Sequence, residues 1–178
     1  SPVSAASKSG TLISALVVSR ASCPAMLVSM MALSRTVRAI GPAWLLSKTP
    51  LRISFAGGGS DYFNPNSDLP GKVIVSTINK YMYVCLNKKY NSEIRAAYSL
   101  TENVKNVHKL NHDIIREALK LHNIINGVEI TTLADIPSSG SGLASSSALS
   151  VGLSNVIRKS KDLKISKTLL ASEACKIE

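Results

Sequence analysis

The sequence is poor in aromatic residues, and its acidic residues are missing from one end. Only 4% of the 178 residues are aromatic, and no Asp or Glu precedes Pro50 although five Lys and Arg do. The formal net charge is +10. A basic excess can attract nucleic acid, but no basic patch interleaved with aromatic residues accompanies it. We therefore expect no nucleic-acid partner, because the charge can equally draw in a small anionic substrate. A basic nucleic-acid-binding protein remains the third alternative.

Cysteines and long apolar runs are also scarce. The apolar run at 12–18 is interrupted by Arg20 well short of a membrane span, so no membrane partner is expected. The cysteines are far apart and odd in number, which indicates neither a disulfide framework nor a zinc site and favours a reducing cytoplasm. They are Cys23, Cys85 and Cys175.

Residues 1–47 differ in kind from the rest. They are rich in Ser, Ala, Val and Leu, carry Arg and Lys, and have no acidic residue. This composition is typical of a transit peptide or of translated upstream sequence. We predict a non-domain, disordered segment without a function of its own, with organelle targeting as the minority alternative, and one domain at 48–178.

The order of the expected elements favours an α+β fold. Strands are predicted first and most helices later, which does not fit a regular alternation of strands and helices. The strands are expected at 51–55, 73–78, 81–86, 93–98 and 127–133, with 73–78 and 81–86 as two strands around Asn79-Lys80. The helices are expected at 111–122, 145–159 and 166–178, with Ser166 as a plausible N-cap.

The histidines lie in or near the first predicted helix. His108 and His112 are four residues apart, a spacing that a helical metal site could use. Neither a Cys nor a carboxylate pattern supports such a site, so surface positions are favoured for these two and for His122.

A loop of small residues joins the last predicted strand to the helix at 145–159. Its glycines permit positive φ, and the helix start offers unpaired N–H groups and the positive end of the helix dipole. These properties suit a phosphate. The alternatives are a flexible linker and a serine-capped helix that binds nothing. A Walker A loop is excluded because no Gly-Lys-Ser/Thr follows the glycines.

The same loop resembles the phosphate loop of the GHMP small-molecule kinases. That family has Pro, three residues and Gly-Leu-Gly-Ser-Ser, whereas here the spacer is four residues and Ala144 replaces the second glycine. The resemblance implies ATP as cofactor. It assigns ATP binding to Pro137, Ser138, Ser139, Gly140, Ser141, Gly142, Leu143, Ala144, Ser145, Ser146 and Ser147.

A second motif lies at 50–62, where a predicted strand carries Arg52 and a glycine turn follows with Asp61. A carboxylate there can accept hydrogen bonds from sugar hydroxyls, and a guanidinium can stabilise a phosphoryl group. The alternative is a surface turn with an Asx-type bond. The motif resembles the heptose 7-phosphate kinase and fucokinase-like branch of the same family. The resemblance implies a catalytic Arg52 near the transferred phosphate and a substrate site of Arg52, Gly58, Gly59, Ser60 and Asp61.

The resemblance also implies a Mg²⁺ site at Ser146 and Glu178. Glu173 is the competing carboxylate, and an exposed helix charge is the alternative for Glu178. The family's catalytic aspartate would follow shortly after Glu178, beyond the end of the chain, as would a ferredoxin-like C-terminal domain. The chain is therefore expected to be an N-terminal part that is inactive alone.

Together these motifs predict part of an ATP-dependent sugar kinase. It would transfer the γ-phosphoryl group of ATP to a hydroxyl of a sugar or sugar phosphate, with a heptose 7-phosphate as the first candidate. The second alternative is a nucleotide or sugar-phosphate binding module without catalysis. The fold implied by the resemblance is a two-layer α/β sandwich of the ribosomal-protein type. The sequence makes no prediction of oligomeric state.

Overall fold

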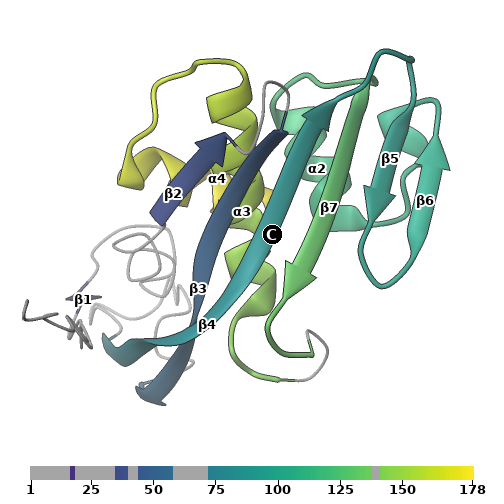
Figure 1. Cartoon of the computed structure of the whole chain (residues 1–178). Coiled ribbons are helices and arrows are strands. Elements are labelled where there is room, and N and C mark those ends of the chain that lie inside the picture. Colours follow the sequence, from purple (N-terminus) through teal and green to yellow (C-terminus); the bar gives the residue numbers. More distant parts are fainter. Residues whose placement is uncertain (1–16, 19–34, 40–43, 58–71, 138–140) are drawn as a thin grey trace, which may run out of the picture.

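A single mixed β-sheet forms one layer of the molecule (Figure 1). In this computed structural model the residues described are 17–18, 35–39, 44–57, 72–137 and 141–178. The strand order is β2-β3-β4-β7-β5-β6, with β1 paired to β4, and every pairing is antiparallel except that of β5 with β7. The strands are β1 (Val17–Val18), β2 (Arg35–Ala39), β3 (Trp44–Ala56), β4 (Lys72–Lys88), β5 (Ile94–Ala97), β6 (Thr101–Val104) and β7 (Val128–Ala134).

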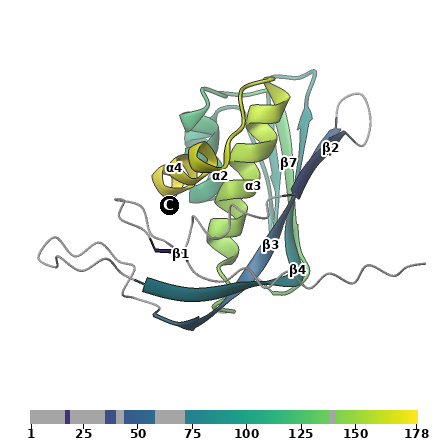
Figure 2. The same cartoon turned by 90° about the vertical axis from the view of Figure 1, so that its left-hand side faces the viewer.

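The helices form the second layer. Figure 2 shows α2 (Asp113–Leu121), α3 (Ser145–Ser160) and α4 (Lys167–Ile177) on one side of the sheet. A short 3-10 helix, η1 (Val107–Lys109), precedes α2. The expected two-layer α+β architecture is therefore confirmed. None of the helices in the described ranges has both the length and the hydrophobicity needed to cross a bilayer.

Helix α3 is the centre of the core. Residues 147–157 of this helix are all buried, because it contacts the sheet on one side and α2 and α4 on others. A Cβ built on Gly152 would lie 3.0 Å from Cγ2 of Val84 and 3.2 Å from Oγ1 of Thr49. Glycine at this position lets the helix approach β3 and β4 closely, which fixes where the first turn of α3 stands relative to the sheet.

The structure extends and corrects several predicted elements. Strand β4 runs without a break through Asn79-Lys80, so the prediction of two strands there is wrong. Its 17 residues stay extended because β3 pairs with it on both sides of this stretch, at 74–77 and at 81–87, with a register shift between Pro50 and Arg52 that takes up the residues in between. Strand β6 was not predicted. Strand β2 pairs with β3, although it lies within the segment expected outside the domain. Most of 1–47 lies outside the described residues, so that boundary stays a prediction.

The helix predictions agree well with the structure. Helix α4 begins as expected after Ser166, whose Oγ accepts a hydrogen bond from the backbone N–H of Leu169 at 3.2 Å. Surface placement is confirmed for His108 but wrong for His122, which is 7% exposed at the C-cap of α2. Among the described cysteines, Cys85 is free and Cys175 is disulfide-bonded, which the sequence did not predict.

Candidate functional site

The predicted strand, loop and helix follow one another as expected. Strand β7 ends at Ala134 and α3 begins at Ser145. Gly142 has φ 65° and Ala144 has φ 56°, so the loop enters the helix through left-handed backbone. Ala144 is the N-cap of α3 and makes no side-chain capping hydrogen bond. Ser138, Ser139 and Gly140 lie outside the described residues.

A backbone hydrogen bond joins the two predicted motifs. The N–H of Arg52 in β3 donates to the carbonyl oxygen of Leu143 in the loop at 3.3 Å. Arg52 is only 5% exposed, so its side chain is buried. The structure therefore brings together the predicted catalytic arginine and the predicted phosphate loop. The remaining predicted substrate residues, Gly58, Gly59, Ser60 and Asp61, lie outside the described residues.

A pocket of about 660 Å³ opens beside the start of α3. Ser145 and Ser146 form one part of its wall, and Asp135, Ile136 and Pro137 form the part next to β7. Its far wall comes from the β5–β6 turn and from the start of α2. The residues there are Tyr98, Ser99, His112 and Ile114.

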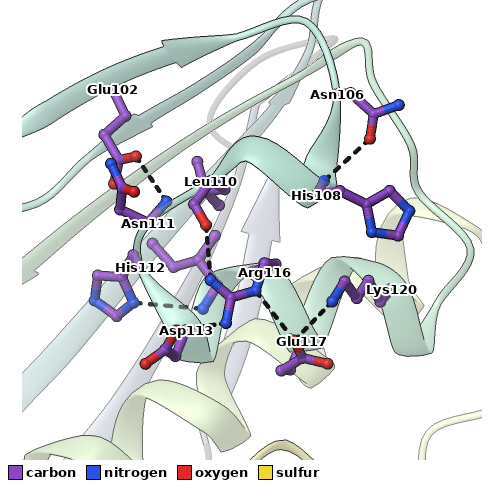
Figure 3. Close-up of polar contacts among 11 residues, drawn as sticks. Glu102, Asn106, His108, Leu110, Asn111, His112, Asp113, Arg116, Glu117 and Lys120 are labelled. Atoms are coloured by element: carbon purple, nitrogen blue, oxygen red, sulfur yellow. Dashed lines mark hydrogen bonds and ion pairs between the residues drawn. The ribbon is translucent and has the colours of Figure 1, made fainter.

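Two aromatic rings stand on the far wall of this pocket. The rings of Tyr98 and His112 meet edge to face, with 4.6 Å between their centroids. Tyr98 donates its hydroxyl proton to Glu102, whose other carboxylate oxygen accepts the backbone N–H of Asn111 at 2.8 Å. Figure 3 shows Asn111 and His112 side by side where the chain enters α2. The wall is thus a hydrogen-bonded unit rather than a loose turn.

His112 also caps α2. Its Nδ1 accepts a hydrogen bond from the backbone N–H of Ile115 at 3.5 Å, which requires that nitrogen to be unprotonated (Figure 3). Burial lowers the pKa of His112 below its ordinary value, against the opposing effect of Glu102. The ring is therefore neutral near pH 7 and can offer an Nε2–H donor.

Asp135 fixes the end of β7 beside the pocket. Its Oδ2 accepts the backbone N–H of Tyr81 at 2.9 Å and lies 3.5 Å from the Tyr83 hydroxyl. Its own N–H donates to the carbonyl of Tyr81 at 3.0 Å. These two hydrogen bonds between Asp135 and Tyr81 of β4 fix the point where the chain leaves the sheet and enters the loop.

Glu173 in α4 and Glu178 at its C-cap have different surroundings. Oε2 of Glu178 accepts a hydrogen bond from Oγ of Ser147 at 3.2 Å, in the first turn of α3. Glu173 instead pairs with Arg158 at 2.5 Å. Ser146, the serine expected beside Glu178, lines the pocket one residue earlier. Among the described residues, no three His, Cys, Asp or Glu side chains gather in a group that could hold a metal.

The comparisons with known proteins agree with this geometry. Residues 103–178 match the family described as GHMP kinases N terminal domain. A search of curated protein sequences finds no match. The chain has the GHMP kinase N-terminal fold. The match begins in β6 and covers α2, β7, the predicted phosphate loop, α3 and α4.

Several solved structures of small-molecule kinases share this arrangement. A D-glycero-D-manno-heptose 1-phosphate kinase from Bacteriodes thetaiotaomicron is 28% identical, with a TM-score of 0.63 over 75% of this chain and 47% of that one. The mevalonate kinase of Methanococcus jannaschii is 15% identical, with a TM-score of 0.60 over 79% and 47%. The galactokinase of Lactococcus lactis, solved with galactose, is 18% identical, with a TM-score of 0.58 over 86% and 40%. The chain spans a little under half the length of these structures.

Sequence reasoning missed the far wall of the pocket. Tyr98 and His112 are brought together by the turn after β5 and by the cap of α2, and neither feature has a motif of its own. His112 could have been found as an N-cap, because it precedes a strongly amphipathic helix. Asp135 offered a clearer signal, as an acidic residue between an apolar strand and a proline.

Proposed function

We propose that this chain carries the nucleotide-binding part of an ATP-dependent sugar kinase. The enzyme would transfer the γ-phosphoryl group of ATP to a hydroxyl of a sugar or sugar phosphate. The observation that carries this proposal is one pocket whose wall is shared by the phosphate-loop serines Ser145 and Ser146 and by the ring pair of Tyr98 and His112. Its volume of about 660 Å³ is in the range of small-molecule sites.

In this proposal the phosphates of ATP lie at the start of α3. The positive end of the dipole of that helix favours anions. The hydroxyl of Ser141 is buried and has no hydrogen-bond partner among the described residues, so it is available to a phosphate oxygen. The nucleobase then extends toward Tyr98 and His112, where it can contact the edges and faces of two fixed rings.

The residues beside the loop fit a magnesium ion. Mg²⁺ prefers oxygen ligands, and the Glu178 carboxylate lies within hydrogen-bond distance of the Ser147 hydroxyl. We propose that Glu178 holds the ion together with Ser146 or its neighbour Ser147. When bound, Mg²⁺ would supply charge neutralisation at the phosphates.

The sugar side of the site rests on the first motif. We propose that Arg52 stabilises the charge of the transferred phosphoryl group, and the backbone hydrogen bond of Arg52 to Leu143 supports this by bringing the two motifs together. Asp61, with Gly58, Gly59 and Ser60, would hold the sugar by accepting hydroxyl hydrogen bonds. A heptose phosphate is our first substrate candidate, supported by the 28% identity to a heptose 1-phosphate kinase. Fucose and galactose follow in that order.

The first experiment is a thermal melt of the whole chain with and without Mg-ATP. A ligand that binds only the folded state must raise the melting temperature. We expect Ser146→Ala to reduce the shift and Ser172→Ala, an exposed serine on α4, to leave it unchanged. If the wild-type melting temperature does not respond to Mg-ATP, the nucleotide site is refuted.

A second experiment separates a kinase from a binding module without catalysis. Because the chain is expected to be inactive alone, heptose, fucose and galactose substrates are offered with ATP to the full-length enzyme that would contain it and to the Asp61→Ala variant of that enzyme, and sugar phosphate is measured. Transfer that Asp61→Ala abolishes supports the kinase. Saturable ATP binding without transfer to any of the sugars favours the binding module.

A further inference from the structure

A buried ionic cluster lies between α3 and α4. Glu173 is 9% exposed, and its Oε1 accepts a hydrogen bond from Nη1 of Arg158 at 2.5 Å. Its other oxygen, Oε2, lies 3.4 Å from Nε2 of His122. None of these three residues lines the pocket, and the proposed phosphoryl transfer makes no use of them.

Further bonds connect this cluster to the loop between the two helices. Nε of Arg158 donates to the carbonyl of Lys164 at 2.8 Å, and Nζ of Lys161 donates to the carbonyl of His122 at 2.5 Å. The Glu173 carboxylate is therefore enclosed by the end of α3, the C-cap of α2 and the α3–α4 connection. A buried carboxylate is costly without a cation, so this side chain is satisfied in only one placement of α4.

The same helix also delivers the carboxylate proposed to bind Mg²⁺. Glu178 lies five residues after Glu173, which is about 7.5 Å along a helix axis. Between them Ala174 packs against Val151 of α3 in a small apolar cluster. Glu178 itself is exposed and has one weak contact, the 3.2 Å bond from Ser147. That contact alone is too weak to fix the helix.

We infer that the Arg158–Glu173 pair sets the register of α4 on α3 and thereby holds the Glu178 carboxylate beside Ser147. Arg158 and Glu173 are then positioning residues for the metal site, and this inference rests on the proposed function of Glu178. A slip of one residue along α4 would rotate the Glu178 side chain by about 100° around the helix axis, away from α3. The buried apolar side chains of α4 and the disulfide bond of Cys175 also hold this helix, and the ion pair adds a directional contact that is made in one register only.

The test uses the whole chain and two independent readouts. Glu173→Gln keeps the size of the side chain and removes its charge. Arg158→Lys keeps the positive charge but loses the planar guanidinium group, which can donate several hydrogen bonds in a fixed geometry. The double variant R158E/E173R restores the pair with its charges exchanged. Asp162→Asn is the matched control, because it removes an exposed ion pair at the same end of α3. The readouts are amide hydrogen exchange at 174–178 without ligand, and the Mg²⁺ concentration at half-maximal ATP-dependent thermal shift.

We expect Glu173→Gln to speed exchange at 174–178 and to raise the half-maximal Mg²⁺ concentration about tenfold, as loss of a supporting partner commonly does. ATP binding without metal should not change. Arg158→Lys should give a smaller effect in the same direction, R158E/E173R should recover both readouts, and Asp162→Asn should change neither.

Two results would overturn the inference. One is a folded Glu173→Gln with a lower melting temperature but wild-type exchange and Mg²⁺ requirement, because the pair would then be only structural. The other is a folded R158E/E173R that recovers neither readout. If wild type shows no Mg-ATP response, the proposed function fails on its own, and exchange at 174–178 in Glu173→Gln still decides whether the pair anchors α4.

Discussion

The backbone N–H of Arg52 donates to the carbonyl of Leu143, so main-chain atoms connect strand β3 to the proposed phosphate loop. This contact does not depend on the guanidinium. Arg52→Met and Arg52→Pro both lack the guanidinium, but only the proline variant lacks the N–H. We expect Arg52→Pro to be the less stable of the two by at least about 1 kcal/mol and to give the smaller ATP-dependent shift. Urea unfolding and melts with Mg-ATP measure the difference, and equal behaviour of the two variants would show that the bond does not hold the loop.

Ala144 is strained where a glycine would not be. Its φ of 56° is a left-handed conformation that costs an L-residue roughly 1–2 kcal/mol. We expect Ala144→Gly to stabilise the chain by up to about 1 kcal/mol, after allowing for the greater freedom of glycine in the unfolded state. Denaturant unfolding measures this change.

Gly142 provides the reciprocal control for that experiment. A Cβ at this position meets nothing within 4 Å, so Gly142→Ala tests only its φ of 65°. We expect a loss of about 1 kcal/mol. If Ala144→Gly also lowered the stability, backbone strain at Ala144 would be contradicted. The result would then point to a stabilising contact made by the Ala144 methyl group.

The cap of α2 makes stability depend on pH. Burial lowers the pKa of His112 below its ordinary value of 6.5, so the unfolded chain binds this proton more readily than the folded one. Stability from the neutral ring is complete above pH 6.5 and is lost as the pH falls from there toward the folded pKa. Unfolding curves between pH 7.5 and about 5 measure the slope.

Asparagine at position 112 separates this effect from that of other groups. His112→Asn keeps a capping oxygen and removes the titration, so its stability should fall less than that of wild type over the same pH range. His108→Asn, at an exposed histidine, should follow wild type. Burial also lowers the pKa of His122, which contributes to wild type and both variants alike. A His112→Asn profile parallel to that of wild type would contradict a neutral capping role.

Gly152 marks the closest approach of α3 to the sheet. A methyl group there would lie 3.0 Å from Cγ2 of Val84 and 3.2 Å from Oγ1 of Thr49, which is too close for both. We expect Gly152→Ala to cost about 1–3 kcal/mol by overpacking, even though alanine favours helices. Ser160→Ala, at the end of the same helix, is the comparison that reports helix propensity together with the loss of the hydrogen bond from the Ser160 hydroxyl to the Ile157 carbonyl. Stabilisation by Gly152→Ala would mean that α3 can move away from β4.

The sequence predicted the elements whose signals are local. The apolar alternation of β7, the serine cap of α4 and the small-residue loop before α3 all carry their information within a few neighbouring residues. The continuity of β4 does not, because Asn79-Lys80 looks like a turn and only the pairing with β3 on both sides of it keeps the strand continuous. Ser147 was expected to bind phosphate and Ser146 to share the metal site with Glu178. The helical rotation between the two serines decides which one contacts that carboxylate, and spacing alone could not show it.

The length of β3 allows unfolding of the sheet to be observed separately from binding of a nucleotide. Trp44, the single tryptophan of the chain, begins this strand, and Arg52 lies eight residues further on beside the phosphate loop. An extended strand covers that interval in about 26 Å. Trp44 is 39% exposed and does not line the pocket, so its fluorescence follows unfolding of the sheet without direct quenching by a bound purine. The fluorescence of Trp44 can therefore be used to measure the free energy of unfolding at any nucleotide concentration.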